Sequence, residues 1–197
     1  MSRAGGDAVD AEYFRQMYEA DPDPWGFETS WYEQRKYALS LAMLPQARYR
    51  KAFEPGCSIG VLTRLLADRC DEVLATDVVA SALQTAGSRL QDAGQNHVRF
   101  ERRPAQDWPA ETFDLVVFSE LGYYLGCKGL TTALASAAAS LEPGGTFISV
   151  HWRHPLDDGD LTGDDVRDAV RSTSGWRQLA EYTDDDVTID VMSRDGA

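Results

Sequence analysis

The residues with the clearest capacity for chemistry lie in the stretch K-A-F-E-P-G-C-S-I-G, from Lys51 to Gly60, and at Asp77. Gly56 allows a sharp turn after a short apolar strand, with no side chain between backbone and ligand. Ser58 keeps the loop narrow, and Gly60 lets the next helix begin close to the sheet with its N–H groups facing the ligand. Asp77 ends a second apolar run, where a carboxylate accepts both ribose hydroxyls in this architecture. The pattern predicts a nucleoside-binding strand, loop, helix and strand.

The spacing of this loop separates two cofactors that share the geometry. A nicotinamide fingerprint G-x-G-x-x-G that starts at Gly56 needs a glycine at position 61, which is Val61 here. The sequence instead fits [D/E]-x-G-x-G-x-G, with Ser58 in the middle glycine position. Glu54 would repel a pyrophosphate but can reach an ammonium group directly or through water. The spacing therefore favours S-adenosylmethionine, against the alternative that a glycine-containing turn is only a turn.

Composition excludes several other classes of protein. With 197 residues, 43% of them hydrophobic, the chain can form one α/β domain, for which we expect a helical cap over 1–48 and a cofactor-binding core over 49–197. The formal charge of −13 argues against nucleic acid as a partner, since phosphate binding depends on Lys and Arg. The same excess of carboxylates also has a simple explanation in solubility.

The three cysteines, Cys57, Cys70 and Cys127, have neither disulfide-framework nor zinc-ligand spacing, so we expect no metal. The N-terminal residues lack an apolar signal core, and no run approaches the length of a bilayer span. We therefore expect a cytoplasmic protein without a membrane partner.

The elements that must position these residues alternate between strand and helix after two N-terminal helices, over 9–18 and 32–44. We expect strands at 52–55, 72–76, 97–100, 113–119 and 145–151, with helices between most of them. The continuous apolar run F-D-L-V-V-F-S at 113–119 is typical of a buried parallel strand. A short helix at 161–170 and an antiparallel hairpin of 176–183 and 186–193 follow. The predicted fold class is α/β: a doubly wound Rossmann-like sheet, mostly parallel, with an antiparallel C-terminal hairpin and a helical N-terminal cap.

Residues 50–152 resemble class I S-adenosylmethionine-dependent methyltransferases. More narrowly, Y-F-R-Q-M-Y-E-A-D-P-D-P-W-G-F-E-T-S-W-Y-E-Q-R-K-Y, F-E-P-G-C-S-I-G and S-E-L-G-Y-Y-L resemble the rhizobial nodulation protein S family, over residues 12–152. Members of that family N-methylate the free amine of a deacetylated chitooligosaccharide. The resemblance implies an adenine-side segment at 104–107 and a cap arginine, Arg35, that pairs with the carboxylate of the donor; a surface salt bridge is the alternative role for Arg35. The expected cofactor-binding residues are Glu54, Gly56, Cys57, Ser58, Gly60, Asp77, Val78, Ala105, Gln106, Ser119, Trp25 and Arg35.

Two residues at the carboxyl edge of the predicted sheet are candidates for catalysis. An amine acceptor must lose a proton before it attacks the methyl group, so a nearby base is useful. His151, at the end of the fifth predicted strand, has the better intrinsic pKa for a base near neutrality. Glu120, after the fourth predicted strand, is the second candidate. An orienting or packing role for His151 and a ligand-binding role for Glu120 remain open.

Aromatic residues supply the candidates for acceptor binding. We expect Trp31, Tyr123 and Tyr124 to bind substrate, with Trp25 and its neighbours closing over the donor. The alternative is that these aromatic residues belong to the core. The acceptor is predicted to be a small molecule or oligosaccharide with an amine. O-methylation of a small metabolite, or a non-catalytic cofactor-binding protein, are the other functions that the sequence allows.

Overall fold

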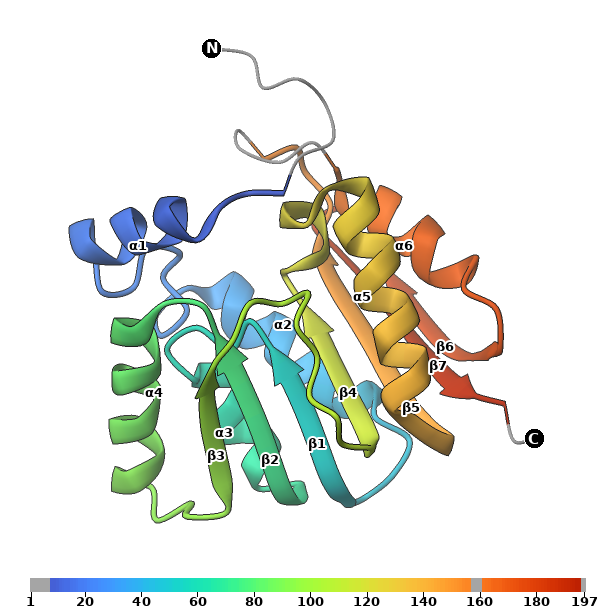
Figure 1. Ribbon diagram of the computed structural model, residues 1–197, viewed down its shortest axis with the longest axis horizontal. Helices are drawn as coiled ribbons and strands as arrows, with labels where there is room; N and C mark the ends of the chain where they lie inside the picture. Colours follow the sequence, from blue (N-terminus) through green and yellow to red (C-terminus); the bar gives the residue numbers. More distant parts are fainter. Residues whose placement is uncertain (1–7, 157–160, 196–197) are drawn as a thin grey trace. The chain divides into compact units, whose positions relative to one another are not determined.

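From residue 49 onward strands and helices mostly alternate, as the sequence predicts, with no helix between the strands at 98–102 and 113–119 or between those at 176–183 and 187–194 (Figure 1). The computed structural model describes residues 8–156 and 161–195. By their internal contacts the described residues divide into two units. We call Asp10–Ala105 the N-terminal unit, and residues 106–156 and 161–195, with residues 8 and 9, the C-terminal unit. The predicted single domain, with a cap over 1–48 and a core over 49–197, stays a prediction.

The N-terminal unit begins with two helices and continues with a parallel β-sheet. Its elements are α1 (Ala11–Ala20), α2 (Trp31–Met43), β1 (Tyr49–Pro55), α3 (Val61–Ala67), β2 (Cys70–Asp77), α4 (Ala80–Asp92) and β3 (Val98–Arg102). β2 lies between β1 and β3 and pairs with both in parallel. Consecutive parallel strands need helical crossovers, which α3 and α4 provide. This arrangement brings the carboxyl ends of β1 and β2 to one edge.

The C-terminal unit combines a parallel pair of strands with the antiparallel hairpin. Its elements are β4 (Phe113–Ser119), the short helix η1 (Gly122–Tyr124), α5 (Gly126–Ser140), β5 (Leu141–Trp152), α6 (Gly163–Arg171), β6 (Trp176–Thr183) and β7 (Val187–Arg194). β4 and β5 pair in parallel, β7 pairs antiparallel with β5, and β6 pairs antiparallel with β7. The predicted C-terminal hairpin is therefore confirmed.

Most element boundaries differ from the prediction by one to four residues, and two of these shifts have clear local reasons. α1 begins at Ala11 because the side chain of Asp10 accepts a hydrogen bond from the N–H of Tyr13 at 2.9 Å and caps the helix. β5 begins at Leu141 instead of position 145. Leu141 pairs with Phe113 before residues 142–145 bulge out of the ladder, and regular pairing resumes at Thr146.

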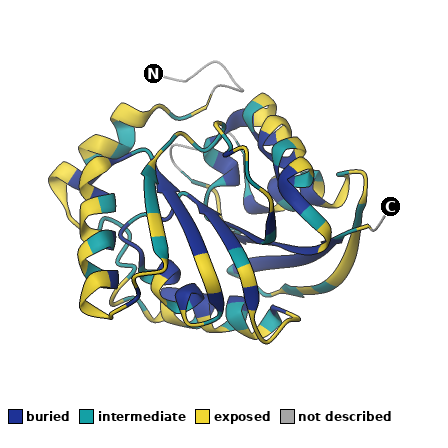
Figure 2. Cartoon of the chain, turned by 60° about the horizontal axis from the view of Figure 1, so that its bottom comes forward, coloured by how far each residue is buried: buried dark blue, intermediate teal, exposed yellow. Residues whose placement is uncertain are grey.

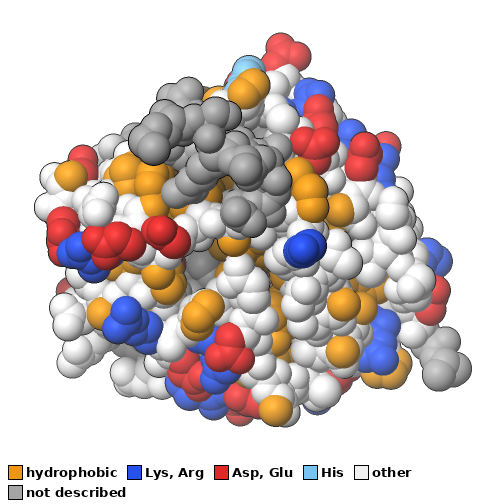
Figure 3. All heavy atoms as spheres, turned by 45° about the horizontal axis from the view of Figure 1, so that its top comes forward, with side chains coloured by type: hydrophobic (Ala, Val, Ile, Leu, Met, Phe, Trp, Pro, Cys, Tyr) orange, Lys and Arg blue, Asp and Glu red, His pale blue; other side chains and the backbone are white. Residues whose placement is uncertain are grey.

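Burial follows the strands in both units (Figure 2). In β4 the side chains of Phe113, Leu115, Val116, Val117 and Phe118 are all buried, which agrees with the continuous apolar run in the sequence. The exposed positions gather on the outer faces of the helices. On the face drawn in Figure 3, Asp and Glu side chains lie among Lys and Arg side chains. Among the described residues, no helix combines the length and apolar character needed to cross a membrane.

Candidate active site

The loop after β1 has the backbone that its sequence predicts. Gly56, Ser58 and Gly60 have φ of +73°, +53° and +75°, in the left-handed region. Ser58 is thus a non-glycine residue in a conformation that suits glycine, at a cost of about 1–3 kcal/mol. Gly60 caps the N-terminus of α3, and a Cβ atom there would lie 2.8 Å from the Cβ of Ala86 on α4. The absence of a side chain at Gly60 therefore permits the close approach of α3 and α4.

Asp77 ties this loop to the end of β2. One carboxylate oxygen accepts from the N–H of Ser58 and the other from the N–H of Val79, both at 2.9 Å. The side chain is nearly buried, and burial raises the pKa of Asp77 above its ordinary value. Each carboxylate oxygen retains a further lone pair, which is the capacity that two ribose hydroxyls require.

Glu54, on β1, places a carboxylate in the interior of the N-terminal unit. Its exposure is 3%, and its Oε2 atom has no hydrogen-bond partner among the described residues. Burial, together with the negative charge of Asp77, raises the pKa of Glu54 to about 8. An unpaired buried carboxylate oxygen is costly unless a cationic partner approaches it. The residues of this loop therefore fit a ligand with a ribose and an ammonium group.

The cap aromatics divide between core and surface. Trp25 and Phe27 pack against a buried cluster that contains Tyr18, Ile59 and Val79, so they cover the loop after β1. Trp31 is 74% exposed, at the first position of α2. Trp25 thus lies where a cover for the loop is expected, while Trp31 is a surface residue.

The remaining predicted cofactor residues lie at element ends. Val78 directly follows β2 and packs at the edge of the same cluster. Arg35 is half-buried on α2. Ala105 ends the N-terminal unit, and Gln106 begins the C-terminal unit. Ser119 is the last residue of β4 and pairs with Val150.

The same helix α2 carries a buried ion pair that the sequence analysis missed. Lys36 is 1% exposed, and its Nζ lies 2.7 Å from Oε2 of Glu33. Three rings surround the ammonium, at 5.1 Å for Tyr32, 5.3 Å for Tyr37 and 6.0 Å for Phe27. The (i, i+3) spacing of Glu33 and Lys36 was visible in the sequence, but such pairs are ordinarily exposed.

A second cluster of predicted residues gathers at the carboxyl ends of β4 and β5, in the C-terminal unit. Glu120 directly follows β4 and has φ of +54°, a strained value for a non-glycine residue. Its Oε2 atom accepts hydrogen bonds from the hydroxyl of Tyr123 and, at 3.3 Å, from the backbone N–H of Trp152. The Tyr124 ring meets that of Tyr123 edge to face, with centroids 4.8 Å apart. The Glu120 carboxylate is thus held in one place by two neighbouring segments.

His151 belongs to this cluster, but with a geometry that differs from that of an available base. It is 1% exposed, and its Nε2 atom lies 3.0 Å from the N–H of Gly122. A backbone N–H only donates, so Nε2 accepts and the proton of the neutral ring lies on Nδ1, 3.1 Å from the hydroxyl of Ser149. The lone pair of Nε2, which a general base needs in order to accept a proton, therefore already accepts a hydrogen bond.

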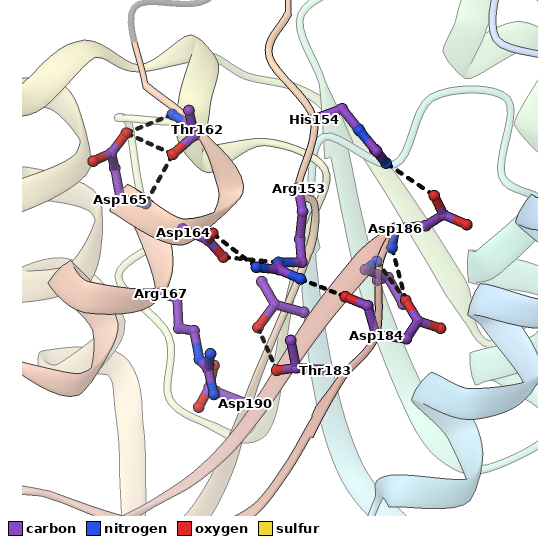
Figure 4. Close-up of polar contacts among 12 residues, drawn as sticks. Arg153, His154, Thr162, Asp164, Asp165, Arg167, Thr183, Asp184, Asp186 and Asp190 are labelled. Carbon is purple, nitrogen blue, oxygen red and sulfur yellow. Dashed lines mark hydrogen bonds and ion pairs between the residues drawn. The ribbon is translucent and has the colours of Figure 1, made fainter.

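Two glycines and an arginine fix the surroundings of His151. A Cβ atom at Gly122 would lie 2.6 Å from Cγ1 of Val166, and one at Gly163 would lie 2.2 Å from the carbonyl oxygen of Trp152, so α6 packs directly on this region. Just beyond β5, Arg153 forms two hydrogen bonds to Asp164, of 3.0 and 3.1 Å, and donates to the carbonyl of Asp184 (Figure 4). These contacts hold the end of β5 against α6 and the β6–β7 turn.

The comparisons with known proteins identify the family. The model for nodulation protein S (NodS) matches residues 8–157. The chain belongs to the nodulation protein S family. Nodulation protein S of Bradyrhizobium diazoefficiens is 32% identical over 129 residues, which are 64% of this chain and 61% of that protein. The match thus spans about three fifths of the length of this curated relative.

Solved structures agree with this family assignment. A crystal structure from Pseudomonas syringae, assigned to the methyltransferases, is 39% identical, with a TM-score of 0.73 over 84% of this chain and 100% of that one. The N-methyltransferase NodS from Bradyrhizobium japonicum WM9, in complex with S-adenosylhomocysteine, has a TM-score of 0.83 at 20% identity, over 94% of this chain and 99% of that one. The predicted α/β Rossmann-like fold is confirmed. The chain thus belongs to the NodS family and has the fold of the S-adenosylhomocysteine-bound N-methyltransferase.

The raised pKa of Glu54 predicts a pH dependence of donor binding. Pairing of Glu54 with the ammonium group of S-adenosylhomocysteine would require the carboxylate form, so below about pH 8 a proton would have to leave Glu54 before the pair forms. We expect affinity to rise by up to about tenfold per pH unit from pH 6 towards 8, and then to level off. Calorimetry in buffers of matched ionic strength measures this slope.

Two variants test whether Glu54 causes this pH dependence of affinity. Glu54→Gln removes the titrating group and is expected to flatten the profile. Glu72→Gln changes an exposed residue on β2 and should leave the slope intact. A slope that survives in Glu54→Gln would contradict the pairing of Glu54 with the ammonium.

Proposed function

We propose that this chain transfers the methyl group of S-adenosylmethionine to an amine of a small-molecule acceptor. The observation that carries the proposal is the Glu120 carboxylate, which the Tyr123 hydroxyl and the Trp152 N–H hold beyond the carboxyl end of β4. Open α/β folds bind their ligands at this edge of the sheet. A carboxylate fixed there can both attract a protonated amine and accept its proton.

For the donor, we propose roles that follow from the contacts in each unit. Asp77 accepts the ribose hydroxyls, and Glu54 pairs with the ammonium of the methionine part. Trp25 covers the loop, and Arg35 pairs with the donor carboxylate. The proposed set also contains Gly56, Cys57, Ser58, Gly60, Val78 and Ala105 of the N-terminal unit, and Gln106 and Ser119 of the C-terminal unit. Two observations support these roles. Oε2 of Glu54 has no hydrogen-bond partner among the described residues, and each oxygen of the Asp77 carboxylate accepts one backbone N–H and can accept a further hydrogen bond.

When bound, S-adenosylmethionine supplies an electrophilic methyl group on a positively charged sulfur. A protonated amine has no lone pair, so the Glu120 carboxylate first takes one proton from it. The amine nitrogen then forms a bond to the methyl carbon while the bond from that carbon to sulfur breaks, and its electron pair stays on sulfur. Holding the amine in line for this displacement is the main task of the protein, worth on the order of 7–11 kcal/mol in well-oriented reactions.

His151 is proposed as a positioning residue in place of the base that its sequence position suggested. By accepting from the N–H of Gly122 it fixes the turn between Glu120 and Tyr123. Ser149 in turn fixes the ring, because its hydroxyl lies beside Nδ1. Of the two candidates for the general base, we therefore propose Glu120.

An amine on a sugar-like acceptor or oligosaccharide is the finer form of the proposal. Its support is the family, together with one exposed aromatic ring and one pair of tyrosines. Trp31 exposes 74% of its surface, and a flat exposed ring suits stacking on the apolar face of a sugar. Tyr123 is 4% exposed and donates its hydroxyl to Glu120, and the half-buried Tyr124 ring packs on it, so of the two Tyr124 has more surface left to contact the group that carries the amine. The acidic net charge suits a cationic acceptor and disfavours nucleic acid.

A cytoplasmic location is the final part of the proposal. The three cysteines are free thiols, and two of them, Cys57 and Cys70, are buried. Free thiols are usual in a reducing compartment.

The proposed function is tested by turnover with a labelled methyl donor. The panel contains amino sugars and their oligomers, simple primary amines, and phenols or other hydroxylated metabolites. We expect labelled product with amines and none with their N-acetylated counterparts, which lack a basic nitrogen. Transfer to hydroxyl compounds alone would replace the proposal with O-methylation. Binding of S-adenosylhomocysteine without turnover on any acceptor would favour a non-catalytic binding protein.

A further inference from the structure

Tyr18 connects helix α1 to the loop after β1. Within α1, all of which the structure describes, Tyr18 is the one buried residue. Its hydroxyl and the hydroxyl of Ser58 share a short hydrogen bond, although the two residues are 40 positions apart. The Tyr18 ring packs on Ile59 and Val79, and the Trp25 ring meets it edge to face at 5.6 Å. The contact therefore has both a polar and an apolar part.

The position of Ser58 gives this hydrogen bond its importance. Ser58 occupies the middle glycine position of the fingerprint, with φ of +53°, so its backbone conformation is strained. Its N–H donates to Oδ2 of Asp77, the carboxylate proposed for the ribose. A glycine at this position would adopt the same φ without strain but would offer no hydroxyl. Serine thus makes the geometry of the loop depend on a contact from α1.

We propose that Tyr18 is a positioning residue for the nucleoside of the methyl donor, acting through the hydroxyl of Ser58. Through this bond, α1 holds Ser58 in its left-handed conformation, with its N–H on Asp77. Because coupling between two equilibria is reciprocal, donor binding also strengthens the attachment of α1 to the loop. The inference rests on the proposed donor site and adds to it a residue outside the fingerprint.

A double-mutant cycle with S-adenosylhomocysteine tests this role by calorimetry. Tyr18→Phe keeps the ring and its packing but removes the hydroxyl, and we expect affinity to fall about tenfold. In a Ser58→Gly background the partner hydroxyl is already absent, so the same Tyr18→Phe change should alter affinity less than about twofold. Tyr13→Phe, another tyrosine of α1, is the matched control and should leave affinity unchanged.

Amide hydrogen exchange over residues 11–20 gives a second readout that needs no turnover. We expect faster exchange of these amides in ligand-free Tyr18→Phe than in the wild type, and slower exchange in the wild type once S-adenosylhomocysteine is added. Equal losses of affinity in the two backgrounds would overturn the hydroxyl's role and leave Tyr18 a packing residue. Failure of the wild type to bind S-adenosylhomocysteine would instead overturn the donor site itself.

Discussion

We expect the replacement of Asp77 with alanine to lower the affinity for S-adenosylhomocysteine by about 100-fold or more. The variant would lose the two charge-assisted hydrogen bonds proposed to the ribose, each worth roughly 1.5–3 kcal/mol. It would also release the N–H groups of Ser58 and Val79, whose nitrogen atoms lie 2.9 Å from the carboxylate oxygens. Both effects act in the same direction, which is why this change ranks among the largest that we expect. Isothermal calorimetry measures it directly.

Two further variants separate recognition from folding. Asp77→Asn keeps one accepting oxygen, so its affinity should fall between those of the wild type and Asp77→Ala. Asp71→Ala, at the opposite end of β2, removes a surface ion pair with Arg48 and should leave affinity unchanged. Thermal unfolding shows whether each variant is folded at the temperature of the titration. Unchanged affinity in a folded Asp77→Ala protein would contradict the ribose assignment.

We expect Glu120→Gln to lower kcat/KM for an amine acceptor by about 100- to 1,000-fold and to leave donor affinity unchanged. General-base assistance is typically worth 10²–10⁴-fold, and glutamine keeps the size of the side chain without its basicity. The loss should be greatest at low pH, where most of the acceptor is protonated and needs a base. As pH rises, the free amine becomes more abundant, so the variant should recover part of its rate. Steady-state rates from pH 6 to 9 measure both effects.

The two comparison variants for Glu120 both lie on β5. Glu142→Gln changes a carboxylate near the start of β5, at the other end from Glu120, and should retain full activity. His151→Gln keeps an oxygen able to accept from the N–H of Gly122, so activity should remain within about tenfold of the wild type if His151 only positions this turn. A severe loss in His151→Gln combined with near-normal rates in Glu120→Gln would restore His151 as the base.

Local sequence patterns predicted the parts of the molecule that depend on local physics. The run at 113–119 became β4 with those bounds, because a continuous apolar segment has few alternatives to a buried strand. The glycine spacing after β1 predicted the left-handed turn at Gly56 and Gly60. The carboxylate at the end of β2 was found because the loop N–H groups and the ribose need an acceptor at a fixed distance along the chain.

Contacts that residue types alone do not predict are the features that sequence reasoning left out. The hydrogen bond between the N–H of Gly122 and Nε2 of His151 joins residues 29 positions apart. The hydrogen bond between the hydroxyls of Tyr18 and Ser58 joins residues 40 positions apart. The partners of Lys36 are near in the sequence, but only the fold shows that α2 buries this side chain among aromatic rings. In each case the side chain is buried against a partner that its residue type alone does not predict.

The most direct test of the account is the identity of the atom that receives the methyl group. The protein is incubated with S-adenosylmethionine that carries a ¹³C-methyl group and with an amino-sugar oligomer that offers both a free amine and several hydroxyls. The carbon chemical shift and its coupling then distinguish a methyl group on nitrogen from one on oxygen. The account predicts an N-methyl product that depends on Glu120. An O-methyl product, or none from a protein that binds S-adenosylhomocysteine, would contradict it.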